Sequence, residues 1–344
     1  MDPSSRSKCF LLSAGLLFLF FVLVLCWLLG IPPSKTPSTK VIFLKKGTPL
    51  KKVSEVLEQA GIIKDRRFFV FLTTILGGKT KVKAGEYEFH TRMLPLQVLD
   101  ALVKGQVKRH LVTIPEGYTL SQIAQLLEDS NIMEGKEFLQ KATSLTFINA
   151  LGLSQLAGPT LEGYLFPDSY HLVREMDPEE VIQMMVRQFK KVFGPDLSNR
   201  ASELGISERE AVILASIIEK ETPLPEEKPL ISAVFHNRLK KKIPLQSDPT
   251  VIYGIKNFNG NLTREDLARP TPYNTYRIAG LPPTPICNPG KDSLLAAVNP
   301  APVSYLYFVS RNDGSHYFSF DLEEHNRAVW KYQKYPTKNN LTRQ

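Results

Sequence analysis

The sequence predicts an α+β protein in which helices and short strands follow a membrane span. Three observations support this prediction. Residues 10–31 form an unbroken apolar run, a strand–helix–helix–strand–helix pattern occurs twice between residues 41 and 182, and the remaining chain combines helices with one hairpin. At 344 residues the chain is long enough for two or three domains.

The apolar run at residues 10–31 is long enough to cross a bilayer, because 1.5 Å of rise per residue gives about 33 Å. Arg6 and Lys8 precede the run. The positive-inside rule therefore keeps the short N-terminus, residues 1–9, in the cytoplasm and predicts an exported body. No small-x-small cleavage site precedes the Pro-rich linker at residues 32–40, which argues against a cleaved signal peptide.

An internal repeat follows the linker. Residues 46–58 return as residues 116–128, and the apolar positions of both copies have helical spacing. The matched positions are Gly47, Leu50, Val53, Leu57, Ile62 and Phe68 in the first copy and Gly117, Leu120, Ile123, Leu127, Ile132 and Phe138 in the second. Such a module resembles LysM, a small glycan-binding fold, although a plain structural spacer would give the same pattern. We place a LysM-like subdomain at residues 41–109 and a second repeat-related module, continuous with the C-terminal domain, at residues 110–344.

A buried helix is predicted from Ser207 to Thr222. Ser207 and Glu210 form a capping box at its start, and Pro223 cannot continue its hydrogen bonds. Residues 211–218 carry no charge, and a helix that is apolar nearly all round is buried.

Glu219 ends this uncharged run, and its neighbours on the same helical face are Val212, Ala215 and Ser216. Small and apolar neighbours disfavour a charged carboxylate, and a protonated Glu is a general acid. We therefore expect Glu219 to be catalytic. The alternative is a helix-end residue that reaches solvent or pairs with Arg238 or a Lys. Lys220 and Glu221 leave the helix on other faces, and we expect them to face solvent.

The elements after this helix complete the α+β pattern. They are predicted as helices at residues 227–239, 291–298 and 321–332 and as strands at residues 304–309 and 316–320.

Between these elements lie Pro-stiffened loops at residues 244–254, 269–276 and 280–285. They gather amides, hydroxyls and Tyr rings, which hydrogen-bond sugar hydroxyls and stack on sugar rings. Tightly turned surface loops would give the same composition. We predict that eight loop residues bind substrate: Gln246, Ser247, Asp248, Thr250, Tyr253, Tyr273, Asn274 and Tyr276.

Several kinds of chemistry have no motif in this sequence. The six His residues form no HExxH pair, so no metal site is predicted, and no nucleotide-binding loop or GxSxG elbow occurs. The net charge of +9 suits an anionic partner, but no nucleic-acid-binding motif accompanies it, so we expect no nucleic acid partner. Cys287 is the lone cysteine of the exported part. Ser216 and Lys220 have the spacing of a Ser–Lys dyad and remain one alternative nucleophile.

Four motifs in one order, residues 215–222, 245–254, 272–276 and 280–283, resemble the YceG-like endolytic murein transglycosylase family, also called MltG. The resemblance covers nearly the whole chain. It implies a single-pass protein of the bacterial cytoplasmic (inner) membrane with a LysM-like subdomain and an outward-facing catalytic domain that cleaves nascent peptidoglycan strands internally. The resemblance places the family's catalytic Glu at Glu219. It also implies that the enzyme needs no cofactor and that peptidoglycan synthases are candidate partners.

The resemblance also implies a mechanism that needs one carboxylate. The C6 hydroxyl of the muramic acid attacks the anomeric carbon and leaves a 1,6-anhydro end, so no second carboxylate has to activate water. Two alternatives remain open: a muramidase-type hydrolase that uses Glu219 with Asp248, and a non-catalytic peptidoglycan-binding scaffold.

Overall fold

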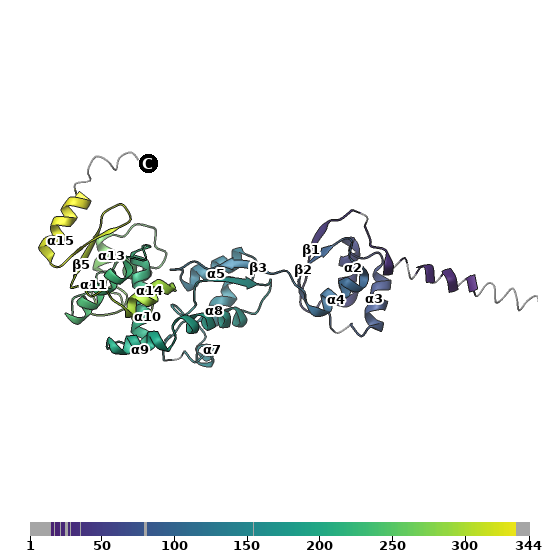
Figure 1. The fold of residues 1–344 in the computed structure, drawn as a ribbon, viewed down its shortest axis with the longest axis horizontal. Helices are drawn as coiled ribbons and strands as arrows, with labels where there is room; N and C mark the ends of the chain where they lie inside the picture. Colours follow the sequence, from purple (N-terminus) through teal and green to yellow (C-terminus); the bar gives the residue numbers. More distant parts are fainter. Residues whose placement is uncertain are drawn as a thin grey trace, which may run out of the picture. The chain divides into compact units, whose positions relative to one another are not determined.

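The computed structural model describes residues 15–334, apart from residues 17, 21, 25, 26, 28, 35, 79, 80 and 154. It contains helices together with short two-stranded sheets (Figure 1). The predicted α+β class is therefore confirmed. Part of the predicted membrane span at residues 10–31 lies outside the described residues. None of the described helices combines the length and the apolar character that a bilayer crossing needs.

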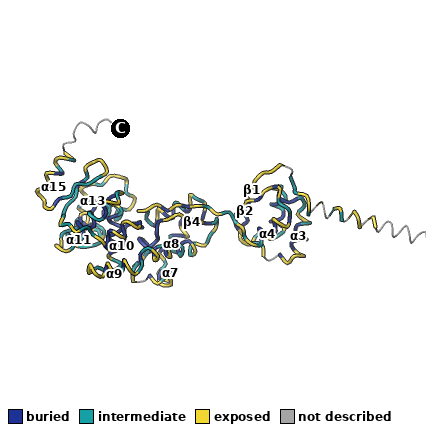
Figure 2. Tube along the Cα trace, viewed as in Figure 1, coloured by how far each residue is buried: buried dark blue, intermediate teal, exposed yellow. Residues whose placement is uncertain are grey.

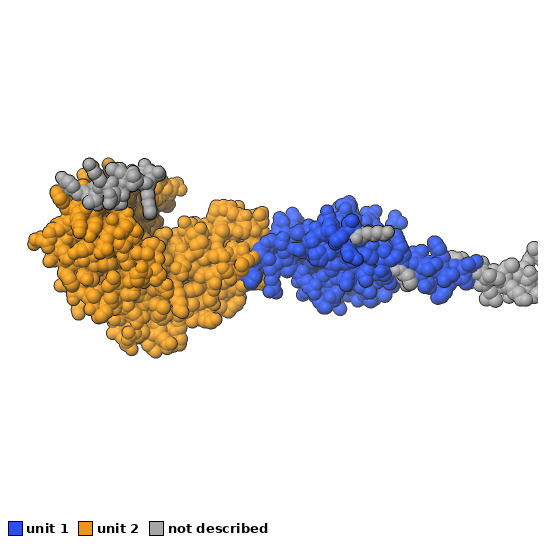
Figure 3. All heavy atoms as spheres, turned by 45° about the horizontal axis from the view of Figure 1, so that its top comes forward, with its two compact units in different colours: residues 1–110, 171–175 blue, residues 111–170, 176–344 orange. Residues whose placement is uncertain are grey.

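The chain divides into two compact units. Buried segments occur in both, as the dark blue parts of the trace show (Figure 2). Unit 1 comprises residues 1–110 and 171–175, and unit 2 comprises residues 111–170 and 176–344 (Figure 3).

Unit 1 contains the first copy of the repeat. Its strands β1 (Thr39–Leu44) and β2 (Gly85–His90) pair antiparallel, with Thr39 opposite His90 and Leu44 opposite Gly85. The helices are α2 (Leu50–Gln59), α3 (Arg66–Ile75) and α4 (Pro95–Lys104). Leu57, Phe69, Tyr87 and Phe89 are fully buried between the sheet and these helices.

The linker predicted at residues 32–40 is shorter than expected. Thr39 and Lys40 belong to β1, and the backbone N–H of Ser38 donates to Oγ1 of Thr91 at 3.0 Å. The sequence rules did not find this start of the strand because Ser, Thr and Lys do not distinguish a polar edge of a sheet from a linker.

The second copy of the repeat has the predicted element order. It contains β3 (His110–Thr113), α5 (Leu120–Asp129), α6 (Gly135–Ala142), β4 (Ser169–Leu172) and α8 (Pro178–Val192), with β3 paired to β4. A short helix, α7 (Leu145–Ala150), is inserted after α6.

One matched pair of the repeat is shifted by a residue. Phe138 of the second copy is fully buried, whereas in the first copy the fully buried ring belongs to Phe69 rather than to the predicted Phe68. The capping residues of α3 and α6, Asp65 and Glu134, show the same shift. The loop before α3 is therefore one residue longer than the match assumed.

The rest of unit 2 is organised around α10 (Glu208–Glu221), whose eight residues from Ala211 to Ile218 are all buried. Ser207 forms the predicted capping box with Glu210, and both of its hydrogen bonds are present. The prediction of a buried helix is thus confirmed. Helix α10 packs on α9 (Pro195–Glu203), α11 (Lys228–Lys240), α12 (Asp248–Tyr253) and α14 (Lys291–Val298).

The C-terminal elements also follow the predicted order. A short helix α13 (Arg264–Ala268) precedes α14, and the hairpin of β5 (Tyr307–Ser310) and β6 (His316–Ser319) precedes α15 (Leu322–Val329). Strand β5 begins three residues later than predicted. A π-helical turn, Trp330–Lys334, continues α15.

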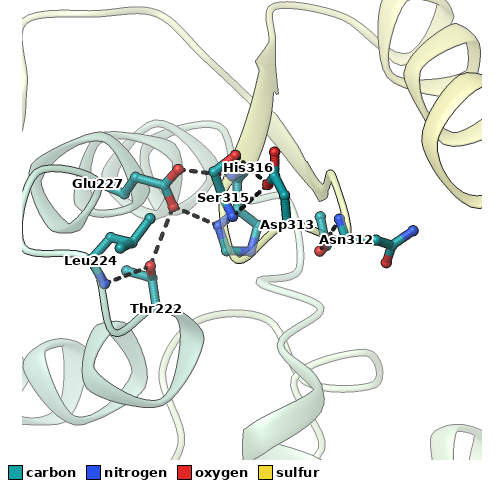
Figure 4. Close-up of polar contacts among 8 residues, drawn as sticks. Thr222, Leu224, Glu227, Asn312, Asp313, Ser315 and His316 are labelled. Carbon is teal, nitrogen blue, oxygen red and sulfur yellow. Dashed lines mark hydrogen bonds and ion pairs between the residues drawn. The ribbon is translucent and has the colours of Figure 1, made fainter. Parts of the chain in front are cut away.

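Glu227 joins the hairpin to the end of α10 (Figure 4). Its Oε1 accepts from the backbone N–H of His316 at 2.8 Å, and its Oε2 contacts Nδ1 of His316 at 2.7 Å and Oγ1 of Thr222 at 3.3 Å. Glu227 is itself buried. A buried carboxylate with three partners fixes the position of the hairpin relative to α10.

Candidate active site

Glu219 lies in the last turn of α10, where three donors contact one of its oxygens. Its Oε2 accepts from Nζ of Lys228 at 3.2 Å, from the backbone N–H of Gly290 at 3.0 Å and from Oγ of Ser293 at 2.6 Å. The side chains of Glu219 and Lys228 are 8% and 3% exposed. The carboxylate is therefore not in the purely apolar environment that the helix periodicity predicted, because residues distant in sequence bring polar groups to it.

The other oxygen of Glu219, Oε1, has no hydrogen-bond partner among the described residues, and it is not a buried atom. One oxygen is thus held in place by three donors while the other remains accessible. This arrangement leaves Oε1 free to exchange a proton with a bound substrate.

The donors of Oε2 are placed by local structure. Gly290 and Ser293 lie at the start of α14, where the N-terminal amides of a helix attract a negative charge. Lys228 opens α11 and is held beside α10 by helix packing.

Glu221, expected to face solvent, instead contacts a loop of the predicted cleft. Its Oε1 accepts from Oγ of Ser247 at 2.5 Å. Burial raises the pKa of Glu221 to about 7; the charge of Asp248 adds to the rise, while Ser247 and Arg238 oppose it. The expectation failed because the loop at residues 245–248 folds over the end of α10, which helical periodicity cannot show.

A cavity of about 370 Å³ adjoins Glu221. Three of the predicted substrate-binding residues line it: Gln246, Asp248 and Tyr276. The hydroxyl group of Tyr276 donates to Oδ1 of Asp248 at 2.6 Å. Arg238 also lines the cavity, and its guanidinium group donates to the backbone carbonyls of Leu245 at 2.8 Å and of other residues nearby.

A larger cleft of about 880 Å³ lies beside Lys220 and is lined by Tyr253 and Glu162. The hydroxyl of Tyr253 donates to Oε2 of Glu162 at 3.2 Å, and its ring packs edge-on against Tyr273 at 4.9 Å. The predicted residues therefore do not share one cleft. Gln246, Asp248 and Tyr276 line the smaller cavity, and Tyr253, supported by Tyr273, lines the larger.

Three predicted substrate-binding residues are buried and use their polar groups within the chain. Ser247 donates to Glu221, and Oγ1 of Thr250 donates to the carbonyl of Ser247 at 2.6 Å. The amide of Asn274 donates to the carbonyls of Leu267 and Arg269 at 3.0 and 2.7 Å. In this structure these residues shape the loops, because a buried polar group must be satisfied by the protein, and their sugar contacts stay a prediction.

Glu162 is a buried acid that the sequence analysis did not single out. It is 3% exposed and accepts from the backbone N–H of Leu120, the amide of Asn288 and the hydroxyl of Tyr253. Burial raises its pKa to about 7, against the lowering effect of these hydrogen bonds. No local pattern marks it, because its partners lie far from it in the sequence.

The alternative Ser–Lys dyad is not assembled. Oγ of Ser216 donates to the carbonyl of Ile213 at 2.7 Å, whereas Nζ of Lys220 lies 3.4 Å from the carbonyl of Gly117. Asp248 accepts from Tyr276, whereas Glu219 accepts from Lys228, Gly290 and Ser293. Within the part of the chain that the structure describes, no three His, Cys, Asp or Glu side chains are grouped as metal ligands.

Comparisons with known proteins agree on one family. The model of the YceG-like family matches residues 42–331. The endolytic murein transglycosylase of Bacillus subtilis (strain 168) is 31% identical over 318 residues, which cover 88% of this chain and 87% of the relative. The endolytic murein transglycosylase of Streptococcus pneumoniae serotype 2 (strain D39 / NCTC 7466) is 32% identical and is matched over 83% of this chain and 57% of its own length.

A solved structure is similar over most of the chain. The crystal structure of a YceG-like protein from Listeria monocytogenes is 30% identical in sequence and superposes with a TM-score of 0.59. The match covers 85% of this chain and 100% of that chain.

Proposed function

The chain belongs to the YceG-like family, and from this membership and the surroundings of Glu219 we propose that Glu219 is the sole general acid and base of its reaction. The protein is a lytic transglycosylase that cleaves peptidoglycan, as its relatives named endolytic murein transglycosylases indicate. The observation that supports the role of Glu219 is the division of its carboxylate into an anchored Oε2 and an accessible Oε1.

The chemistry follows from one carboxylate. Glu219 donates its proton to the leaving oxygen of the GlcNAc residue as the bond from that oxygen to C1 of MurNAc breaks. The C6 hydroxyl of the same MurNAc attacks C1, and Glu219 takes up the proton that this hydroxyl loses. One C–O bond breaks and one forms, the product carries a 1,6-anhydro end, no water is consumed, and Glu219 is again protonated.

The substrate contacts are proposed for the residues that line the two cavities. Gln246, Asp248 and Tyr276 would contact one part of the glycan strand, and Tyr253 would contact another. A carboxylate, an amide and Tyr rings are suited to sugar hydroxyls and to the apolar faces of sugar rings. Internal cleavage requires sites for sugars on both sides of the broken bond, and two cavities can supply them.

The finer location of the activity also belongs to this proposal. The apolar run at residues 10–31 would anchor the chain in the cytoplasmic membrane, with the catalytic domain outside it. Such an anchor would bring the enzyme to nascent strands, where cleavage limits strand length. The LysM-like module would hold the glycan near the site, and peptidoglycan synthases would be partners.

The decisive experiment is mass spectrometry of peptidoglycan after digestion by residues 32–344. This fragment keeps all of β1, whereas a cut after Lys40 would remove two of its residues. Anhydro-muramic ends are expected. Reducing ends would indicate a hydrolase instead, and an absence of cleavage would indicate a binding scaffold.

A further inference from the structure

A second carboxylate, that of Glu116, lies at the donors of Glu219. Glu116 belongs to the turn between β3 and α5, far from α10 in the sequence. Its carboxyl group occupies the space beside Gly290, and a methyl group added at Gly290 would overlap it. The backbone N–H of that same Gly290 donates to Oε2 of Glu219. The two carboxyl groups therefore flank one residue at the start of α14.

The turn that carries Glu116 is fixed to the loop before α14 by hydrogen bonds in both directions. The N–H of Gly117 donates to the carbonyl of Asn288, and the N–H of Asn288 donates to the carbonyl of Tyr118, each at 2.9 Å. Nζ of Lys220 approaches the carbonyl of Gly117 at 3.4 Å. The backbone that follows Glu116 is therefore fixed, although Glu116 itself is an exposed residue.

The two copies of the repeat differ at this turn. Gly47 and Gly117 have the same left-handed backbone, with φ of 82° and 75°. A Cβ added at Gly47 would meet nothing within 4 Å, whereas one added at Gly117 would lie 3.6 Å from Cγ of Glu219. The preceding residue is Lys46 in the first copy and Glu116 in the second. The same turn is thus open in one copy and part of the active site in the other.

Like charges that lie close together influence one another. Burial raises the pKa of Glu116, and the charge of Glu219 raises it further. Lys228 and the backbone N–H of Lys291 lower this pKa, whereas Asp292 raises it. Lys220 is a further charged group beside the turn. The buried ammonium group of Lys228 pairs with Glu219 and also acts on Glu116.

We propose that Glu116 is a positioning residue of the active site: by placing its carboxyl group beside Gly290 and opposing negative charge on Glu219, it keeps the reactive proton on Glu219. This inference rests on the proposed role of Glu219 as the general acid. Like charges oppose each other's ionisation, so a carboxylate at the start of α14 favours the form of a neighbouring general acid that can protonate the leaving oxygen.

The test is the pH dependence of kcat/KM for three variants of the full chain. Glu116→Gln keeps the shape and removes the charge, so the alkaline limb of the profile should move to lower pH by about one unit. Activity should then fall about tenfold on the alkaline side and stay near the wild-type value at low pH. Glu116→Asp keeps the charge on a shorter side chain, so its profile should lie between those of the wild type and Glu116→Gln. Glu137→Gln, an exposed acid of α6 in the same module, is the matched control and should leave the profile unchanged.

A second route displaces Glu116 without replacing it. Gly290 has φ of −76°, which any residue can adopt, so Gly290→Ala should act only by moving the carboxyl group beside it. It should shift the limb in the same direction as Glu116→Gln. In a Glu116→Ala background, where the space is free, Gly290→Ala should have little further effect.

The outcomes separate the two proposals. A uniform loss of rate at all pH values, or no change in Glu116→Gln, would overturn the role of Glu116 while the wild-type enzyme still produced anhydro ends. Wild-type digests without anhydro ends would instead overturn the transglycosylase mechanism itself.

Discussion

At the scale of single residues, the two oxygens of Glu219 have different surroundings, and this difference defines its proposed role. Oε2 has three donors and Oε1 has none among the described residues. A buried ion pair such as that with Lys228 contributes little net stability, yet removing one partner leaves an uncompensated charge. The pair is therefore better understood as a device that orients the carboxylate than as a source of stability.

Glu219→Gln should abolish most activity while the fold persists. The Gln oxygen can still accept from Gly290 and Ser293, but the side chain cannot exchange a proton, so kcat should fall by about 10²- to 10⁴-fold. Release of anhydro-muropeptides measures activity, and circular dichroism checks the fold. Asp248→Asn is the control and should cost less, since Asp248 contacts Tyr276 in the cavity of about 370 Å³, which Glu219 does not line. Near-normal release by Glu219→Gln, together with loss in Asp248→Asn, would exchange the two roles.

Glu162 should make stability depend on pH. Its pKa is about 7 in the folded chain, against an ordinary value of 4.5, so the folded state binds the proton more tightly. Its contribution, up to roughly 3 kcal/mol, is fully present below pH 4.5 and is lost as the pH rises through 7. Glu221, whose pKa is also raised to about 7, should change stability with pH in the same direction.

Urea unfolding between pH 5 and pH 8 measures this effect. The unfolding free energy of the wild type should fall across this pH range. In Glu162→Gln the fall should be smaller, even if the substitution also changes stability at every pH. An equally steep fall in Glu162→Gln would show that the buried carboxyl group does not titrate there.

At the scale of elements, α10 is stabilised at its start by local hydrogen bonds and along its length by burial. The N–H of Glu210 donates to Oγ of Ser207, and Oε2 of Glu210 accepts from the N–H of Ser207. Its uncharged middle packs against α14 and α11. Helix α13 has the same capping box, between Thr263 and Asp266, but no buried residue.

The capping boxes of these two helices should therefore differ in their effect on stability. Ser207→Ala should lower the unfolding free energy by about 1 kcal/mol, because α10 unfolds only with the core. Thr263→Ala should change it less, since an exposed helix can fray while the rest stays folded. Thermal unfolding of both variants measures the difference. Equal losses would mean that α13 is as tightly coupled to the core as α10.

At the scale of the whole molecule, the repeat is used in two ways. The copy in unit 1 packs its own core around Tyr87 and Phe89. The second copy supplies the turn of Glu116, and its buried Glu162 accepts from the amide of Asn288, in the loop before α14. A module predicted as a glycan-binding subdomain or a spacer thus contributes residues to the catalytic domain in its second copy.

The topology of the whole chain is testable with a reporter. Because Arg6 and Lys8 precede the apolar run, a C-terminal alkaline phosphatase fusion should be active, as this enzyme matures only outside the cytoplasm. The same fusion without residues 10–31 should be inactive. Activity of the shortened fusion, or inactivity of the complete one, would contradict the proposed anchor.

The sequence alone determined the features that depend on neighbours along the chain. The capping box predicted the start of α10, and the uncharged run predicted its burial. Helix α14 was predicted at residues 291–298. Each of these features rests on hydrogen bonds and periodicity within a few turns. The doubled module followed from matched apolar positions. Family membership followed from four motifs in order, and the comparisons confirmed it.

Only the tertiary structure decided what surrounds the carboxylate of Glu219. Glu116, Lys228, Gly290 and Ser293 come to Glu219 from three separate parts of the chain, and no local period encodes such a meeting. Glu221, on the same helix, differs from its predicted exposure because a distant loop covers it. Helical spacing fixes the direction in which a side chain leaves its helix, but its partners and solvent exposure depend on long-range packing.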